Sequence, residues 1–296
     1  GDNNVIFDSS RGSNKQLKAN GDDAEDTHSP ARVTFESDGF DLDTDDTNYN
    51  GSSRTYVAWQ WKINGGTTST NSDGNGNDVT IQINSTAGIS IMQWTGDGSN
   101  TSTVGHGLGV KPNMIIAKPL EDSQNWSVAF PYFETAKLLA LNTASAFFSA
   151  SGMSGYGSST FVDGNGSSSE DYIAYCFKNI QGYSKFGQYK GNSSANGPFV
   201  YLGFKPAMVL VKVSSGSNRD WRMVDNKRSD RNPATNELKP NDNAAEGTSG
   251  LQCDLVSNGF KIRTSSSACN DNEDYMYVAF AEHPFVSSEG IPCTAR

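Results

Sequence analysis

Histidine, cysteine and positive charge are scarce in this sequence, and each scarcity argues against a class of function. Its 296 residues include three His, four Cys, and 23 Lys or Arg against 33 Asp or Glu. With so few histidines and no nucleophile-elbow motif, a hydrolase that uses a histidine base is disfavoured. No two cysteines have the spacing of zinc ligands, and the net charge of −10 disfavours binding to a phosphate backbone, which depends on Lys and Arg. We therefore expect a protein that is not an enzyme, binds no nucleic acid and carries no structural zinc.

Long apolar runs and helical periodicity are also missing. No run approaches the roughly 18 apolar residues of a membrane-spanning helix, so we expect no membrane insertion. A helical pattern is suggested only over residues 134–141. Elsewhere, short apolar runs alternate with Gly, Asn, Asp and Ser, which is the pattern of strands joined by polar turns. The sequence therefore predicts an all-β fold of tandem antiparallel β-sandwich domains, jelly-roll-like in organisation.

The sequence contains one domain-sized repeat, present in two whole copies and one partial copy. Matching positions lie about 95 to 120 residues apart, which exceeds the spacing of solenoid repeats and suits a small domain. The partial copy comes first and lacks the first half of the repeat. The matching segments are 108–118 with 202–212, 172–175 with 277–280, 5–8 with 222–225, 37–40 with 257–260, and 56–59 with both 172–175 and 277–280.

The repeat and the composition together predict the domain boundaries. We expect a partial first sandwich over residues 1–63, a second sandwich over 79–179, a third over 180–285, and a C-terminal tail over 286–296. Residues 64–78 are rich in Gly, Ser and Asn, which predicts a flexible linker that lets the first copy move independently.

Two hairpins are marked by the dipeptides Asn258-Gly259 and Asp38-Gly39. Such dipeptides supply the two positive-φ residues of a type I′ turn, whose twist matches that of the flanking strands. The continuously apolar run 208–212 predicts a central strand that is covered on both faces.

The cysteines leave the redox state open. Cross-strand pairing would place Cys253 opposite residue 263 or 264, several residues short of Cys269. A disulfide between Cys253 and Cys269 and a pair of free thiols therefore remain as alternatives. Cys176 lies in an apolar run and is expected to be a buried free thiol, and Cys293 lies in the tail.

Alternating carboxylates make one candidate metal site. Asp41, Asp43 and Asp45 have the spacing found in loops that bind calcium. The glycine that sharpens such a loop is missing, since Asp46 stands in its place, and so is the distal bidentate acid. The alternative is a solvated acidic loop after a hairpin, and no other cofactor is expected.

Aromatic residues make the candidate ligand site. Trp126 and Trp221 recur at one position of the repeat, as core residues would. Trp94 is the best candidate for an exposed, sugar-stacking side chain, and Tyr189 takes its place in the last copy. We therefore expect Trp94 and Tyr189 to be ligand-binding residues.

An acid and an arginine recur three positions apart, as Asp8 with Arg11 and as Asp225 with Arg228. A structural ion pair or turn clamp is the favoured interpretation, and a ligand site is the alternative. The middle copy lacks this pair.

Several of these motifs resemble a known family. The sequence is similar to repeated domains in large tail-fibre-like virion proteins of marine tailed phages, those of cyanobacteria and other ocean bacteria. The resemblance covers essentially the whole chain and implies a structural or adhesive role without established catalytic residues. The segments that carry the resemblance are 7–12, 37–40, 55–62, 105–112, 183–187, 197–201 and 277–285.

These observations together predict a structural or adhesive protein of a tailed phage. It would be a tail fibre, spike or capsid-surface fibre on the virion surface, with other virion proteins and a host-surface glycan as partners. Exposed sandwich edges with few guarding lysines favour homo-oligomerisation, with a trimer as the favoured state. The alternative is a bacterial secreted or cell-surface protein that binds or degrades carbohydrate.

Overall fold

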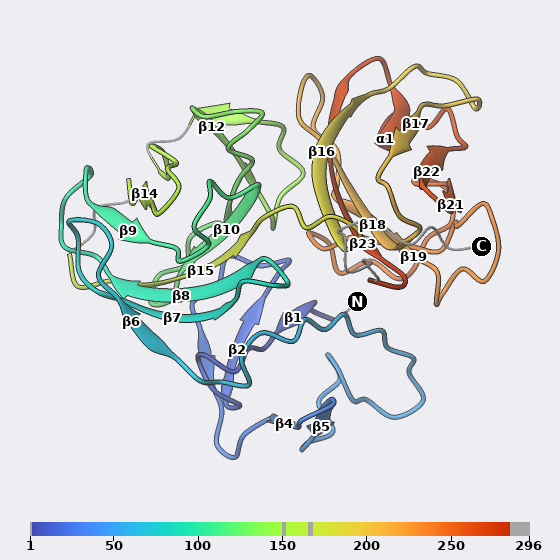
Figure 1. Ribbon diagram of the computed structural model, residues 1–296. Helices are drawn as coiled ribbons and strands as arrows, with labels where there is room; N and C mark the ends of the chain where they lie inside the picture. Colours follow the sequence, from blue (N-terminus) through green and yellow to red (C-terminus); the bar gives the residue numbers. More distant parts are fainter. Residues whose placement is uncertain (1, 150–151, 165–167, 285–296) are drawn as a thin grey trace. The chain divides into compact units, whose positions relative to one another are not determined.

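The computed structural model of the chain describes residues 2–149, 152–164 and 168–284 (Figure 1). It is almost entirely β-structure, and the prediction of an antiparallel all-β sandwich is confirmed. The chain divides into two compact units: unit 1 comprises Gly1–Asn142 and Ser149–Phe177, and unit 2 comprises Thr143–Phe148 and Lys178–Arg296. No helix in the described ranges is long and apolar enough to cross a membrane. The predicted tail, 286–296, and its Cys293 lie outside the described residues.

Unit 2 is a two-layered sandwich. A five-stranded sheet, β16-β23-β18-β19-β20, faces a three-stranded sheet, β17-β22-β21 (Figure 1). Residues of both layers, such as Val209, Tyr277, Val200 and Phe260, belong to one buried cluster. The elements of unit 2 are β16 (Ser184–Lys190), β17 (Phe199–Tyr201), β18 (Pro206–Val213), β19 (Arg222–Asp225), β20 (Glu237–Leu238), β21 (Cys253–Val256), β22 (Gly259–Ile262), α1 (Ser267–Asn270) and β23 (Asp274–Ala281).

Unit 1 contains the middle copy of the repeat together with the partial first copy. Its largest sheet has eight strands in the order β13-β12-β11-β10-β15-β8-β7-β6, and β14-β9 form the opposing layer. The first copy contributes the sheets β1-β2-β3 and β4-β5. The strands are β1 (Val5–Ile6), β2 (Lys15–Lys18), β3 (Asp26–Thr27), β4 (Val33–Phe35), β5 (Phe40–Leu42), β6 (Ser69–Asn71), β7 (Val79–Asn84), β8 (Ile89–Thr95), β9 (Thr103–Gly105), β10 (Met114–Pro119), β11 (Ser127–Ala129), β12 (Lys137–Ala140), β13 (Phe148–Ser149), β14 (Thr160–Val162) and β15 (Asp171–Phe177).

The central strands are those with the longest apolar runs. β18 lies between β23 and β19, and most of its residues are buried, which confirms the expectation for residues 208–212. Its counterpart β10 lies between β15 and β11 in the same way. Strands covered on both faces do not alternate apolar with polar residues, so their pattern is visible in the sequence.

Strand pairing corrects one match between the copies. Lys118 and Lys212, which occupy the same position of the repeat, lie opposite Ile173 and Met276. Ile173 therefore corresponds to Met276, whereas sequence matching aligns it with Val278. A shift of two residues leaves each side chain on the same face of its strand, so the hydrophobic pattern does not reveal it.

The partial first copy packs against the middle copy. The hydroxyl of Tyr175 donates a hydrogen bond to Asp8 Oδ2 at 2.7 Å. The indole Nε1 of Trp126 donates to the backbone oxygen of Lys18 at 2.9 Å. Both copies belong to one compact unit, unit 1.

The segment expected to be a flexible linker, residues 64–78, contains structure of its own. β6 lies within it and pairs with β7 at the edge of the large sheet. Gly74 forms a further bridge with Val104. Its glycines and asparagines therefore serve tight turns beside an edge strand, a role with the same composition as a linker.

Both predicted hairpins form, but their turns are not of type I′. Val256 pairs directly with Gly259, and residues 36–39 join β4 to β5. Gly39 and Gly259 are not among the positive-φ residues. A Cβ on Gly259 would clash with the backbone oxygen of Val200, so this glycine allows the close approach of β17.

Candidate functional site

The aromatic residues expected to bind ligand are buried. Trp94 is 5% exposed and Tyr189 is 7% exposed, so the expectation of an exposed stacking surface is wrong. They do occupy equivalent positions: Trp94 stacks on Tyr172 at 5.3 Å between ring centroids, and Tyr189 stacks on Tyr275 at 5.1 Å. Both polar groups are used inside the sandwich, since the Trp94 indole donates to Asp163 and the Tyr189 hydroxyl donates to the backbone oxygen of Cys269.

The structure does not bring the candidate calcium ligands together. Asp41 lies in β5 opposite Thr34, and Asp43 accepts a hydrogen bond from the Thr34 hydroxyl at 2.8 Å. Within residues 2–149, 152–164 and 168–284, no group of three or more His, Cys, Asp or Glu is placed to hold a metal ion. Asp41, Asp43 and Asp45 therefore do not form the predicted site, because an extended backbone keeps residues two apart about 7 Å from each other, whereas a calcium-binding loop wraps its ligands around the ion.

The repeated Asp–Arg motif is a turn clamp in both copies that have it. Asp225 Oδ1 accepts the Arg228 backbone N–H at 2.9 Å, and its Oδ2 accepts Arg228 Nε at 2.7 Å. Asp8 makes the same two contacts with Arg11, at 2.9 and 2.6 Å. The favoured structural interpretation is confirmed.

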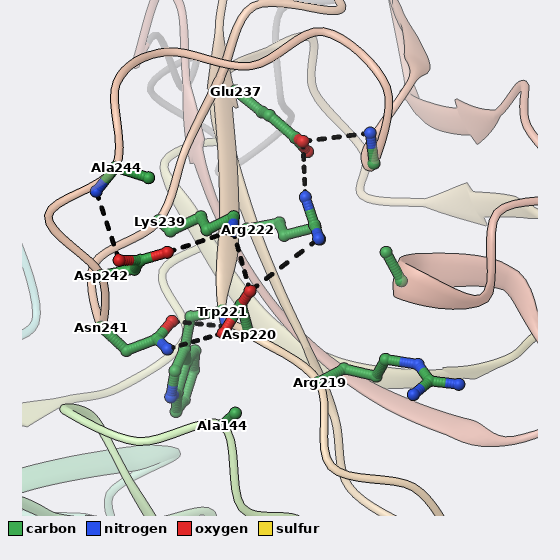
Figure 2. A network of polar contacts seen from close by, with 12 residues as sticks. Ala144, Arg219, Asp220, Trp221, Arg222, Glu237, Lys239, Asn241, Asp242 and Ala244 are labelled. Atoms are coloured by element: carbon green, nitrogen blue, oxygen red, sulfur yellow. Dashed lines mark hydrogen bonds and ion pairs between the residues drawn. The ribbon is translucent and has the colours of Figure 1, made fainter.

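In all three copies, an asparagine side chain makes the same pair of hydrogen bonds. In the third copy, Asn241 Oδ1 accepts the backbone N–H of Trp221, and Asn241 Nδ2 donates to Asp220 Oδ1, each at 2.9 Å (Figure 2). The equivalent triplets are Asn142, Trp126 and Asn125 in the middle copy, and Asn20, Asn4 and Asn3 in the first. A contact set found in every copy indicates an architectural role rather than a binding site. Trp126 and Trp221 are both fully buried, as expected of core residues.

In the third copy, Asn241 and Asp220 belong to a larger network of charged side chains (Figure 2). Lys239 Nζ contacts Asp220 Oδ2 at 3.0 Å and Asp242 Oδ2 at 3.2 Å. Burial opposes the charge of Asp220, but hydrogen bonds from Asn241 and Lys239 hold the pKa of Asp220 below its usual value. The hydrogen bond to Asp220 in turn raises the pKa of Lys239. These groups bind one another and brace the loop that follows β20.

A buried carboxylate lies at the other end of the network. Glu237 is 3% exposed, and its Oε1 accepts from Arg222 Nη1 at 2.5 Å and from the Gly250 N–H at 3.0 Å. Its Oε2 accepts the Leu251 N–H at 2.5 Å. The carboxylate therefore fastens β19 and the loop before β21 to β20.

The described cysteines are free, which decides between the two alternatives for Cys253 and Cys269. Cys253 lies opposite Ile262, close to the expected register. Burial raises the pKa of Cys253 and raises that of Cys269 to about 12, so both thiols stay protonated at neutral pH. Cys176 is a fully buried free thiol, as predicted.

One surface of unit 2 departs from what a sandwich normally exposes. In β17, Val200 points into the core and is 7% exposed, whereas its neighbours Phe199 and Tyr201 are 47% and 61% exposed. Side chains two residues apart lie on the same face of a strand, about 7 Å apart. Outward-facing residues of a sandwich are normally polar, so these two outward aromatics make this strand a candidate binding surface.

Two lysines flank these aromatics. Lys185 Nζ lies 5.3 Å from the centroid of the Tyr201 ring and donates to the Tyr201 backbone oxygen at 2.8 Å. Lys261 lies directly opposite Phe199 across the strand pair. We call Phe199, Tyr201, Lys185 and Lys261 the β17 surface. It combines flat apolar rings with hydrogen-bond donors of positive charge.

The β17 surface is specific to the third copy. β9 is the equivalent strand of unit 1, since Val104 lies opposite Phe161 as Val200 lies opposite Phe260. The residues flanking Val104 are Thr103 and Gly105, so β9 has no aromatic pair. The sequence shows the alternation in Phe-Val-Tyr, but only the fold shows which of the two faces is outward.

The chain matches, over residues 1–284, a family described as a domain of unknown function, DUF7483. It belongs to this family. The match spans all three copies of the repeat and both units, so the family covers the whole described fold. No curated protein and no solved structure matches the chain.

Proposed function

We propose that this DUF7483 chain is a structural, adhesive protein on the surface of a tailed-phage virion, where it binds a host-surface glycan. It would be a tail fibre, spike or capsid-surface fibre that is held by other virion proteins. The β17 surface is the observation that carries the proposal, and the resemblance to marine phage proteins supplies the setting. The polar clusters seen in both units brace the fold, which supports a binding role rather than a catalytic one.

The β17 surface has the chemistry that a sugar needs. A pyranose ring presents a face of C–H groups, which packs on an aromatic ring, and a rim of hydroxyl groups, which accept hydrogen bonds from lysine. Phe199 and Tyr201 lie on a paired strand, so both rings are held in place before the ligand arrives. One such site binds weakly, and repetition on a particle multiplies its effect.

A polysaccharide-binding experiment tests the proposal. The full chain is measured on a biosensor against a panel of immobilised host-cell polysaccharides, beside the double variant Phe199→Ala/Tyr201→Ala. We expect saturable binding by the unaltered chain and at least about a tenfold weaker binding by the double variant, because exposed stacking rings contribute about 1–3 kcal/mol each by comparison with other stacked ligands. Both rings are exposed, so the melting temperature should stay unchanged.

Tyr132→Ala is the matched control. Tyr132 is 54% exposed and lies 4.3 Å from Lys111 Nζ, but it belongs to a turn of unit 1. We expect this variant to bind as the unaltered chain does. Loss of binding in Tyr132→Ala with full binding in the double variant would place the site in unit 1 and overturn our assignment. Release of reducing ends from any polysaccharide would overturn the non-enzymatic proposal and favour a glycan-degrading protein of a bacterial surface.

A further inference from the structure

The charge of the two lysines in the β17 surface is not neutralised by an acidic side chain. Across the parts of the chain that the structure describes, neither Lys185 nor Lys261 forms an ion pair. Lys205, another lysine of unit 2, does form one, since its Nζ contacts Glu282 at 2.8 Å. The whole chain has a net charge of −10, so two lysines on one surface without a carboxylate contact are unusual in it.

A backbone oxygen holds each of these lysine side chains in place. Lys185 Nζ donates a hydrogen bond to the Tyr201 backbone oxygen at 2.8 Å. Lys261 Nζ donates to the Gly197 backbone oxygen at 2.7 Å. An ammonium group has three N–H donors, so each lysine keeps two donors for a ligand. A neutral oxygen fixes the position of the ammonium group without cancelling its charge.

The two lysines come from different layers of the sandwich. Lys185 lies in β16, at the edge of the five-stranded sheet, directly opposite the core residue Ala279. Its aliphatic stem therefore runs along the interior, and its ammonium group emerges beside the Tyr201 ring. Partial burial lowers the pKa of Lys185, so its charge is poorly solvated and gains from an anionic partner. Because Lys261 lies opposite Phe199, a positive group flanks each of the two rings.

The carboxylate next to Lys261 already has a partner of its own. Asp254 lies opposite Lys261 where β21 pairs with β22. Its Oδ2 contacts Arg263 Nε at 3.4 Å. With Lys185, these four groups comprise three positive charges and one negative charge. The β17 surface is therefore locally positive on a protein whose net charge is strongly negative.

We propose that the glycan bound by the β17 surface is acidic and carries carboxylate or sulfate groups. Lys185 and Lys261 bind these groups while the sugar rings pack on the aromatic side chains. The inference rests on the function proposed above and adds the charge of the ligand to it. Carboxylate and sulfate oxygens accept charge-assisted hydrogen bonds, which are stronger than those that a sugar hydroxyl accepts. The rest of the acidic surface repels a polyanion, so the attraction is confined to this one place.

Three dextrans that share one glucan backbone test the charge directly: plain dextran, carboxymethyl dextran and dextran sulfate. Each is biotinylated and immobilised for biolayer interferometry with the full chain. We expect at least about tenfold tighter binding to one of the charged dextrans than to plain dextran, because hydrogen bonds to charged groups contribute more than neutral ones. The preference should shrink at roughly 0.5 M salt. Comparison of the two charged dextrans distinguishes a carboxylate from a sulfate ligand.

Paired substitutions assign the preference to the two lysines. Lys185→Gln/Lys261→Gln should bind all three dextrans equally, because both rings remain. Lys185→Arg/Lys261→Arg keeps the charge and should keep the preference. The matched control is Lys190→Gln/Lys227→Gln, which removes the same charge from two exposed lysines of unit 2, at the end of β16 and in the turn after β19. We expect the control to keep the preference, and melting temperatures show that each variant is folded.

Several outcomes would overturn the inference. Two of them are equal binding of the three dextrans by the unaltered chain, and absence of binding to both charged dextrans. Two others are a preference that survives Lys185→Gln/Lys261→Gln, and binding to a charged dextran that Phe199→Ala/Tyr201→Ala leaves unchanged.

The panel of host-cell polysaccharides decides the proposed function separately. A chain that binds this panel through Phe199 and Tyr201, but shows no preference among the dextrans, would keep the proposed function and lose this inference. Absence of binding to every host polysaccharide would count against the proposed function itself.

Discussion

Replacing Glu237 by glutamine removes one negative charge from the interior of unit 2 and changes the size of the side chain very little. The carboxylate accepts three hydrogen bonds, from Arg222 Nη1 and from the amides of Gly250 and Leu251. Figure 2 shows its contact with Arg222. A glutamine has one oxygen and one NH₂ group, so at least one of these donors would face another donor. The Arg222 guanidinium, 14% exposed, would also lose its ionic partner.

The expected loss of unfolding free energy for Glu237→Gln is about 3 kcal/mol. Leaving a buried donor without its acceptor costs about 1–3 kcal/mol, and breaking a buried ion pair costs about 3–5 kcal/mol. The lower end applies because glutamine keeps one acceptor and Arg222 keeps Asp220 at 4.0 Å. For a domain of this size the melting temperature would fall by roughly 10 °C.

Differential scanning calorimetry of the full chain measures this effect, with the transition of unit 1 as an internal reference. Glu246→Gln is the control, because Glu246 pairs with Arg228 at 2.8 Å but is 39% exposed, and we expect it to cost less than about 1 kcal/mol. A loss below about 1 kcal/mol for Glu237→Gln, or a loss equal to that of the control, would refute the reasoning.

Two further predictions concern pH and assembly. Lys212 is fully buried and its Nζ contacts backbone oxygens; burial lowers its pKa to about 7 from the ordinary value of 10.5. Between these values the unfolded chain holds a proton that the folded chain has released, so the stability of unit 2 should rise from pH 7 to about 8.5, by at most about 1.4 kcal/mol per pH unit. Denaturant titrations at these pH values measure the slope; Lys212→Met should flatten it, and an unchanged slope in the variant would assign it to other groups. We also predict that the chain self-associates, with a trimer as the favoured state, because short sandwich edges are left with few guarding lysines. Light scattering that gives a monomer at all concentrations would contradict this.

Local patterns in the sequence predict the strands of unit 2 well. Short apolar runs bounded by polar turn residues predict seven of its strands, and each strand appears within a few residues of the predicted bounds. These runs are 183–189, 199–203, 208–213, 221–224, 252–256, 260–264 and 275–281. β20 is only two residues long, too short to show a period, and it was not expected. The helical pattern at 134–141 proved to be β12, because the apolar run there is buried as a strand of the large sheet. The residue pattern of one segment indicates the length and burial of its strand, but it does not indicate which strand pairs with it.

The candidate site shows the limit of such patterns. Trp94 and Phe199 both alternate with smaller residues, yet Trp94 faces the core and Phe199 faces solvent. Gly187 gives a second example, since it lies opposite Tyr277 and a Cβ there would clash with the Tyr277 ring. The reason for a glycine at this position lies almost a hundred residues away in the chain, on the neighbouring strand.

The sequence by itself determined the all-β class, the repeat, the central strands and the turn clamps, because each depends on residues close together in the chain or on a pattern that recurs. Only the tertiary structure decided which face of each strand is outward, that the expected linker joins a sheet, and that Asp41, Asp43 and Asp45 do not converge. These features depend on which distant strands pair and in what register. Either face of a strand can be the buried one, and the tertiary packing decides which face it is.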